Sequence, residues 1–305
     1  MFGRGQQSRP GRHQAGGRFC PCGLGKSLIH IGDRVMNGGA SLMQRLEGKS
    51  IVITGGTKGV GRRVALAAVS AGACVTFAGR DEQAAAEIIK ECGPEKRTRI
   101  QFAAGDLRKP ADCEKLMQTA AQAYGGIDGL FNYAGILPAA TLMETTAELF
   151  DDVFAIDVKG PFFCCKYVLP YLLDRQGGSI VNTGSVHAYA GEIDRAAYAC
   201  AKGALLTLTK HLSMNYARDK IRCNWLTMGW VPTPGELALR QAEGREAGWL
   251  DKIGREVMPM GRLQTVEDHV EAILYLLSDA SSQVTGSELQ MTGGFWPAAP
   301  TYQHR

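Results

Sequence analysis

The sequence lacks long apolar runs and any regular cysteine pattern. No apolar stretch approaches the roughly 20 residues that a membrane-spanning helix needs, so we expect no membrane segment. The nine cysteines are scattered and odd in number; the closest pairs, Cys20–Cys22 and Cys164–Cys165, do not have structural-zinc spacing. A disulfide framework is not expected in a chain this long. Cysteines in apolar runs are typical of small buried side chains, which favours a reducing, cytoplasmic compartment.

The sequence also lacks metal-ligand clusters, paired carboxylates and a basic surface for nucleic acid, so we expect no metal site and no nucleic-acid partner. The net charge of +4 comes from residues 1–47, whose seven basic and two acidic side chains sum to +5 and leave −1 for the rest. Because it has no sustained periodicity, the segment 1–46 is predicted to be a disordered basic tail. A transit segment, or a translation start assigned upstream of Met36 or Met43, accounts for it.

What the chain does have is the composition of a globular α/β protein. With 45% hydrophobic and 21% charged residues, it suits one domain of roughly 250 residues. The predicted strands are 49–54, 73–78, 99–103, 127–131, 178–183, 221–226 and 288–291. The predicted helices are 62–71, 80–92, 111–124, 145–173 (with a possible interruption near Gly160–Pro161), 195–218 and 266–278. This alternation predicts a doubly wound parallel sheet, whose ligands bind beyond the carboxyl ends of the strands.

A glycine-rich turn connects the first predicted strand to the first helix. It contains Gly55, Gly59 and Gly61 and lies in a βαβ unit of about 30 residues. Glycines at such a turn allow close backbone approach, so that a pyrophosphate can sit on the helix N-terminus. The pattern therefore predicts a dinucleotide site.

A tyrosine and a lysine, Tyr198 and Lys202, lie four residues apart in a strongly helical stretch. They share one helix face, where the Lys202 ammonium is expected to lower the pKa of Tyr198 toward working pH. Such a pair can act as a general acid or base. Ser185, thirteen residues before Tyr198, follows a predicted strand, so its hydroxyl is expected at the same sheet edge.

These motifs together resemble the classical short-chain dehydrogenase/reductase family. The resemblance covers about residues 46–295 and rests on Thr54-Gly55-x-x-x-Gly59-x-Gly61, Asn132-x-Ala134-Gly135, Ser185 and Tyr198-x-x-x-Lys202. It implies a single Rossmann-like domain at residues 47–297 with a seven-stranded sheet, followed by a short tail, 298–305. It also implies hydride exchange between a nicotinamide cofactor and a small alcohol or ketone. A homodimer or homotetramer packed through the helices at 145–173 and 196–217 is expected.

The same resemblance implies roles for individual residues. Tyr198 would be the proton donor, Lys202 would hold the nicotinamide ribose, and Ser185 would bind the substrate oxygen. The implied cofactor-binding residues are Thr54, Gly55, Thr57, Lys58, Gly59, Val60, Gly61, Arg80, Asp106, Leu107, Asn132, Ala134, Gly135, Tyr198, Lys202, Gly229, Val231 and Thr233. The candidate substrate contacts are His187, Ile193 and Trp230, in two irregular stretches that include a predicted lid at 230–261.

The end of the second predicted strand bears on the choice of cofactor. An NAD site usually has a carboxylate there, whereas this chain has Gly79 followed by Arg80, with Lys58 inside the glycine turn. Two cations favour a 2′-phosphate, so NADP is predicted, with NAD as the alternative. The competing interpretation is that Arg80 only helps to start the next helix beside Asp81.

Four positions depart from the family pattern: Asp157, Tyr133, Met228 and Thr292. Asp157 replaces an asparagine that supports a water relay to the active-site lysine, and it is assigned to the catalytic set. Because of these departures, a cofactor-binding scaffold with impaired chemistry remains an alternative to an active oxidoreductase. A sugar-nucleotide epimerase is disfavoured by the glycine spacing.

Overall fold

The computed structural model describes residues 45–232, 237, 244 and 248–296, which fall within one compact unit, residues 40–305. The predicted tail 1–46 therefore lies outside the described residues except for Arg45 and Leu46, and the predicted tail 298–305 lies wholly outside them. Leu46 is fully buried and donates its backbone N–H to the Ala71 carbonyl at 3.0 Å. The folded body thus includes the last residue of the predicted tail.

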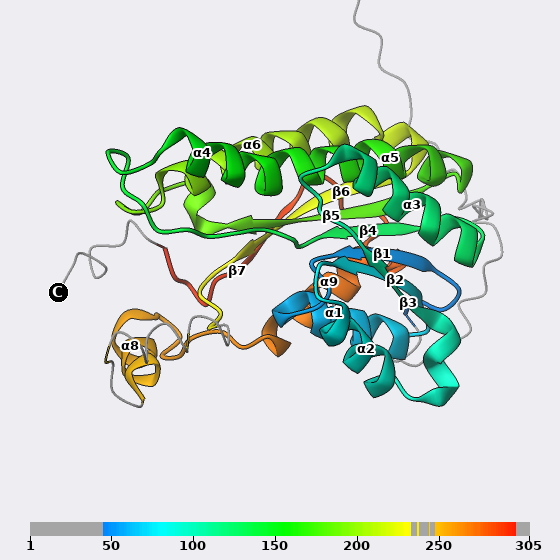
Figure 1. Ribbon diagram of the computed structural model, residues 1–305, viewed down its shortest axis with the longest axis horizontal. Helices are drawn as coiled ribbons and strands as arrows, with labels where there is room; N and C mark the ends of the chain where they lie inside the picture. Colours follow the sequence, from blue (N-terminus) through cyan, green and yellow to red (C-terminus); the bar gives the residue numbers. More distant parts are fainter. Residues whose placement is uncertain (1–44, 233–236, 238–243, 245–247, 297–305) are drawn as a thin grey trace, which may run out of the picture. The chain divides into compact units, whose positions relative to one another are not determined.

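A seven-stranded parallel sheet forms the centre of this unit (Figure 1). Its strands are β1 (Ser50–Thr54), β2 (Cys74–Gly79), β3 (Ile100–Ala104), β4 (Gly129–Asn132), β5 (Gly178–Ser185), β6 (Ile221–Met228) and β7 (Glu288–Met291). They lie in the order β3-β2-β1-β4-β5-β6-β7, which confirms the predicted doubly wound sheet. The chain reverses its direction of travel across the sheet between β1 and β4, the point where such folds bind ligands.

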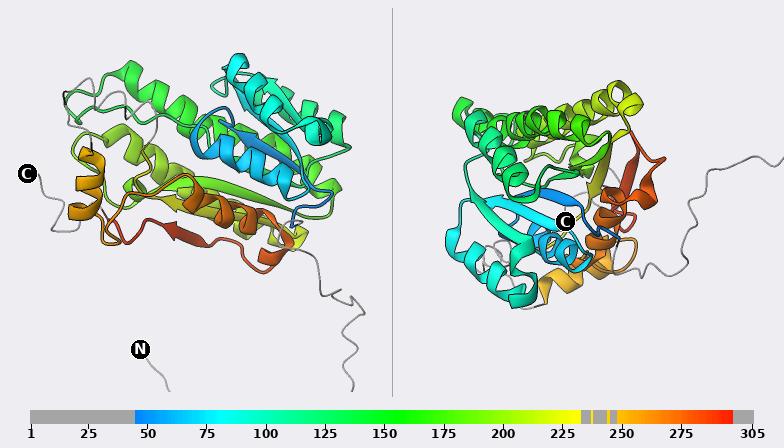
Figure 2. Two further views of the ribbon diagram at one scale, coloured as in Figure 1. Left: turned by 90° about the horizontal axis from the view of Figure 1, so that it is seen from below. Right: turned by 90° about the vertical axis from the view of Figure 1, so that its right-hand side faces the viewer.

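Helices cover both faces of the sheet. Among the described residues the α-helices are α1 (Gly59–Ser70), α2 (Glu82–Glu91), α3 (Pro110–Tyr124), α4 (Ala147–Phe154), α5 (Gly160–Asp174), α6 (Ala196–Asn215), α8 (Trp249–Val257) and α9 (Glu267–Leu277). α1, α2 and α9 lie on one face, and α3, α5 and α6 on the other, as the views in Figures 1 and 2 agree. None of the described helices is both long and apolar enough to cross a membrane.

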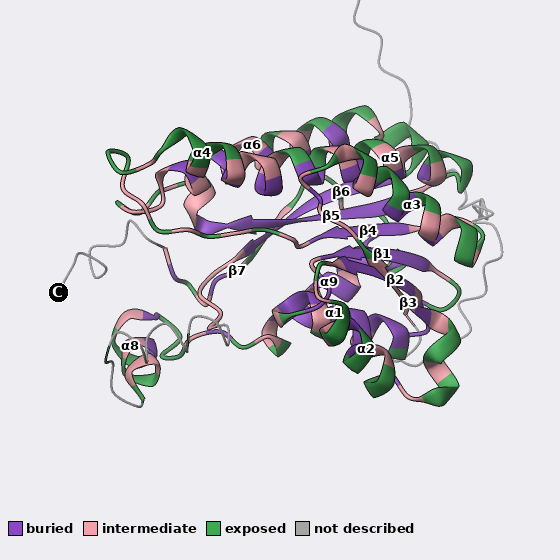
Figure 3. Cartoon of the chain, in the orientation of Figure 1, coloured by how far each residue is buried: buried purple, intermediate pink, exposed green. Residues whose placement is uncertain are grey.

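The central strands are buried on both faces, as Figure 3 shows. β1 carries a run of β-branched residues and is buried at every position, which is typical of a parallel strand between two helical layers. One hydrophobic cluster joins the sheet to α1 and α9, and a second joins it to α3 and α5. These two cores hold the carboxyl ends of β1, β4 and β5 in fixed positions.

Two differences from the predicted elements lie close to the candidate active site. β5 runs two residues further than predicted, so Ser185 is the last residue of the strand instead of following it. The helix predicted over 145–173 is divided into α4 and α5 by a π turn at Ala155–Lys159, just before Gly160–Pro161. π turns of this kind are frequent at functional sites, and this one contains Asp157.

Candidate active site

The glycine-rich turn after β1 forms a cradle that side chains would fill. Gly55 has φ +68°, and a Cβ on it would lie 2.8 Å from the Ala134 Cα. Gly59 has φ +54° and opens α1, whose N-cap, Lys58, makes no side-chain capping bond. The first backbone N–H groups of α1 therefore face a space kept open by glycine, an arrangement suited to a phosphate. The residues present thus fit a dinucleotide.

Two of the predicted cofactor residues tie strands together. The Thr54 hydroxyl accepts the backbone N–H groups of Tyr133 and Ala134 at 3.0 and 3.1 Å, which fixes the end of β1 against the end of β4. Asn132 is buried and donates to the Asn182 side chain at 2.9 Å, linking β4 to β5. Both residues shape the site from behind.

A cavity of about 1030 Å³ opens beyond these strand ends and brings most of the predicted residues together. The predicted residues that line it are Gly55, Thr57, Lys58, Gly59, Arg80, Asp106, Leu107, Ala134, Gly135, Asp157, Ser185, His187, Tyr198, Lys202, Gly229, Trp230 and Val231. Those that do not line it are Thr54, Val60, Gly61, Asn132 and Ile193. Thr233 lies outside the described residues.

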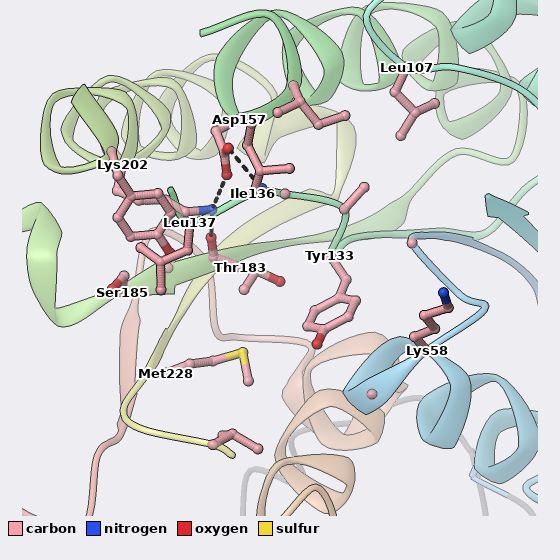
Figure 4. A pocket seen from close by; sticks show the side chains of 18 of the residues that line it. Lys58, Leu107, Tyr133, Ile136, Leu137, Asp157, Thr183, Ser185, Lys202 and Met228 are labelled. Atoms are coloured by element: carbon pink, nitrogen blue, oxygen red, sulfur yellow. Dashed lines mark hydrogen bonds and ion pairs between the residues drawn. The ribbon is translucent and has the colours of Figure 1, made fainter. Parts of the chain in front are cut away.

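Ser185, Tyr198 and Lys202 all line this cavity, and Figure 4 shows Ser185 and Lys202 with Asp157. Ser185 is 7% exposed at the end of β5, and its hydroxyl lies within hydrogen-bonding reach of the Tyr198 phenol. Lys202, one turn after Tyr198 on α6, is 3% exposed, and its Nζ lies 5.4 Å from the Tyr198 ring centroid. The same Nζ donates to the Thr183 carbonyl at 3.2 Å. The tyrosine and the lysine therefore lie together on one face of α6, as their four-residue spacing predicts.

The pKa of Tyr198 does not shift in the predicted direction. Burial raises this pKa above its ordinary value, and the nearby Lys202 ammonium opposes the rise only in part. The Asp157 carboxylate adds to the rise, whereas the Ser185 hydrogen bond reduces it. The expectation of a lowered pKa was wrong because desolvation of the phenolate outweighs the lysine. Tyr198 is thus held in its proton-donating form.

Asp157 forms a buried ion pair with Lys202. Its Oδ1 lies 3.2 Å from Lys202 Nζ, and the exposed fractions of the two side chains are 0% and 4%. Its Oδ2 accepts the Ile136 backbone N–H at 3.1 Å. The pair is not a well-aligned hydrogen bond, since Oδ1 has no hydrogen-bond donor in suitable geometry among the described residues. Burial raises the pKa of Asp157, and Lys202 and the Ile136 N–H oppose this rise.

The pKa of Lys202 is raised, whereas the pKa of an isolated buried lysine is lowered. Burial alone would lower its pKa, but Tyr198 and then Asp157 raise it above the ordinary value. The lysine therefore stays a cation in a nearly water-free place. The π turn supplies this effect by directing the Asp157 carboxylate toward α6.

Charged side chains gather around the ends of β2 and β3. Asp106 accepts hydrogen bonds from the backbone N–H and the Nη1 of Arg108 at 3.1 and 3.2 Å. Arg108 also donates from Nε to the Asp152 carboxylate at 2.6 Å. Arg80 is exposed on the cavity wall. Asp81 caps α2 by accepting the Ala84 N–H, which supports a role for this segment in starting the helix.

The two cations nearest to the glycine turn, Lys58 and Arg80, differ in their contacts. Lys58 pairs with Asp81 at 3.2 Å and is 75% exposed, so this contact is weak and easily exchanged. The Asp81 carboxylate is shared between the helix cap and Lys58. Arg80 therefore remains a strong candidate to meet an anionic group entering the cavity.

His187 and its neighbours form the wall opposite the glycine turn. The His187 ring lies edge-on to Tyr198, with centroids 5.8 Å apart, and its Nε2 lies 3.9 Å from the Glu192 carboxylate. Burial lowers the pKa of His187, so the imidazole is neutral near pH 7, although Glu192 opposes the shift. Trp230 packs against Trp249, with centroids 6.4 Å apart, which joins the segment after β6 to α8.

Ile193, a predicted substrate contact, is not brought to the cavity. It is 69% exposed and does not line the cavity, because the loop before α6 directs it outward. Residues that sequence reasoning missed do line the cavity: Arg108, Thr183, Glu192 and Arg195. Arg195 lies three residues before Tyr198, one helical turn away, and this spacing was the available signal. Thr183 acts through its backbone carbonyl, for which side-chain identity carries no signal.

Known proteins resemble this chain over almost the whole described unit. The family model described as enoyl-(acyl carrier protein) reductase matches residues 55–296. The 2,5-dichloro-2,5-cyclohexadiene-1,4-diol dehydrogenase of Sphingobium indicum is 35% identical over 255 residues, covering 83% of this chain and 99% of that protein. The 7alpha-hydroxysteroid dehydrogenase of Clostridium sardiniense is 32% identical over 263 residues, covering 85% and 98%. A solved short-chain dehydrogenase/reductase of Brucella melitensis matches with a TM-score of 0.74 and 29% identity, covering 83% and 98%.

The fold, the glycine cradle and these matches define the class. The chain belongs to the short-chain dehydrogenase/reductase family. It is an oxidoreductase of CH–OH groups that uses NAD(H) or NADP(H) with small-molecule alcohols or ketones. Within the described residues, no cluster of three or more His, Cys, Asp or Glu side chains is placed to hold a metal ion.

Proposed function

We propose that this chain is an NADP-dependent alcohol/ketone oxidoreductase in which Tyr198 is the general acid and base. The observation that carries the proposal is the buried Lys202–Asp157 pair beside Tyr198, with the Ser185 hydroxyl within reach of the phenol. A structural role alone would not require a lysine and an aspartate to be buried at the wall of an open cavity, where their desolvation is costly.

Ser185, Tyr198 and Lys202 have different roles in the proposed reaction. Ser185 and Tyr198 bind the oxygen of the substrate, and the bound nicotinamide supplies the hydride that reaches the carbonyl carbon. Tyr198 donates its proton to the oxygen as negative charge develops there, and in alcohol oxidation it removes that proton. Lys202 stabilises the resulting phenolate, because it remains a cation beside Asp157. Its contact with the Thr183 carbonyl holds the ammonium in place.

A preference for NADP is supported by the charges around the end of β2. Arg80 lines the cavity and is exposed, and Lys58 lies nearby on the glycine turn. Of the carboxylates near them, Asp81 is engaged with Lys58 and the α2 N-terminus, and Asp106 is engaged with Arg108. A 2′-phosphate would thus meet two cations, whereas the 2′-hydroxyl of NAD has no free carboxylate to bind at this point.

The proposal is tested by mixing purified protein with NADPH and a panel of ketones and aldehydes, and following the loss of absorbance of the reduced nicotinamide. Oxidation of NADPH with at least one carbonyl compound is expected. Tight NADPH binding without turnover on any compound would favour the scaffold alternative. An equal rate with NADH would count against the NADP preference alone.

We also propose that the chain works as a homodimer or homotetramer in the cytoplasm. Apolar side chains remain exposed along α5 and α6: Phe162 at 48%, Leu173 at 43% and Met214 at 81%. Such exposure on long helices favours association with a second copy. Light scattering after size exclusion is expected to give a multiple of 32.8 kDa, and replacing Phe162 by Glu should reduce it.

A further inference from the structure

Tyr133, directly after β4, is held in a fixed position beside the start of α1. Its ring stacks on Phe131, with centroids 5.7 Å apart. A Cβ on Gly61 would lie 2.7 Å from the Tyr133 Cδ1, and a Cβ on Gly59 would lie 2.9 Å from its hydroxyl oxygen. Both glycines therefore make room for this ring as well as for a ligand. The Tyr133 ring cannot swing far without losing these contacts.

The hydroxyl of Tyr133 lies at the N-terminus of α1. Lys58, the N-cap of α1, provides no side-chain cap, and the nearby Val60 backbone N–H opposes the rise in the pKa of the Tyr133 phenol. Burial raises the pKa of Tyr133, so the phenol keeps its proton at neutral pH. In the described part of the chain, no acceptor takes that proton. Tyr133 itself lines the cavity, and Figure 4 shows its ring between the strand ends and the turn that carries Lys58.

We propose that the Tyr133 hydroxyl donates a hydrogen bond to the diphosphate of the bound dinucleotide. The proposal rests on the proposed function, because it needs a dinucleotide in the cavity. The hydroxyl lies beside Gly59 at the start of α1 and offers an O–H donor at this helix end. The anion is thus bound by a proton of Tyr133 together with the backbone N–H groups of the turn.

The test compares two ligands on the variant Tyr133→Phe. Calorimetry measures the Kd of NADPH and of adenosine 2′-monophosphate, which has the adenosine and the 2′-phosphate but no diphosphate. Because a hydrogen bond to a charged group is lost, the Kd of NADPH should rise about tenfold or more, whereas that of adenosine 2′-monophosphate should stay unchanged. Tyr124→Phe, at the end of α3 and away from the cavity lining, is the matched control and should change neither value.

A second measurement uses the wild-type chain and does not depend on how the variant folds. With tyrosines labelled at 13Cζ, the Tyr133 resonance should shift on adding NADPH and not on adding adenosine 2′-monophosphate. An unchanged Kd for NADPH in Tyr133→Phe, tighter NADPH binding, or equal losses for both ligands would overturn this inference alone. Failure of the wild type to bind either NADPH or NADH would overturn the proposed function and this inference with it.

Discussion

Replacing Asp157 by Asn tests the electrostatics of the site, because it removes one buried charge and keeps the shape of the side chain. Two unit charges 3.2 Å apart, the distance from Lys202 Nζ to Asp157 Oδ1, interact by about 5 kcal/mol at an effective dielectric constant of about 20. The cost of burying the carboxylate offsets much of this attraction. The net electrostatic change is therefore smaller than this attraction, and at the neighbouring Tyr198 we expect a fall in the pKa of the phenol.

The direction in which the pKa of Tyr198 shifts in Asp157→Asn follows from how Asp157 acts on Tyr198 and on Lys202. Asp157 raises the pKa of Tyr198, so its loss should lower that pKa. Lys202 also loses a partner, but Tyr198, which raises its pKa, and the Thr183 carbonyl remain in place, so Lys202 should stay protonated. The Tyr198 base form then becomes available at lower pH.

The assay is the pH dependence of kcat/KM for alcohol oxidation, with one substrate taken from the screen. In Asp157→Asn the rising limb should move to lower pH. Asp174→Asn, at the exposed end of α5, should leave the profile where the wild type has it. A profile of Asp157→Asn that coincides with the wild type, or that moves to higher pH, would refute the claim that an ionised Asp157 acts on Tyr198.

Three further predictions concern other parts of the chain. Tyr198→Phe should lower kcat by about 10²- to 10⁴-fold, since it removes the proton donor, while the Kd of NADPH measured by calorimetry stays within about twofold; retained turnover would remove Tyr198 from its proposed role. Arg80→Ala should weaken NADPH binding about tenfold or more and spare NADH, whereas Arg97→Ala, on an exposed turn away from the cavity lining, should affect neither; equal losses for both cofactors would contradict the NADP preference. His269 is fully buried without a partner among the described residues, and burial lowers its pKa to about 4. Above pH 6.5 both the folded and unfolded chains hold it neutral, so stability should fall as the pH drops from 6.5 to 4, by up to about 3 kcal/mol. In urea unfolding His269→Gln should flatten this loss, and an unchanged slope would show that other groups cause it.

Much of the fold could be predicted from the sequence because the elements are strongly patterned. The predicted strand 288–291 coincides with β7, and the other strands differ by one or two residues at their ends. An interruption of the long helix near Gly160–Pro161 was predicted, and the π turn at Ala155–Lys159 lies directly before it. That the interruption is a π turn was not predicted, since the sequence motif of Gly and Pro does not say which kind of turn precedes it.

The candidate site was predictable where it depends on spacing and less so where it depends on loops or burial. The four-residue spacing of Tyr198 and Lys202 correctly predicted that both meet at the cavity. That Ile193 is exposed and does not line the cavity could not be predicted, because the path of an irregular loop has no period. The pKa direction of Tyr198 was missed because desolvation depends on the packing of several elements around the phenol, which the sequence spacing does not describe.

The most direct test of the central claim is to follow the hydride itself. The purified chain is incubated with NADPH deuterated at both C4 positions and with the best carbonyl compound from the screen, and the alcohol product is analysed by mass spectrometry. With the wild type, we expect one deuterium per product molecule, on the carbinol carbon. With Tyr198→Phe, we expect almost no deuterated product. Product without deuterium, or no product with any carbonyl compound despite bound NADPH, would contradict this claim.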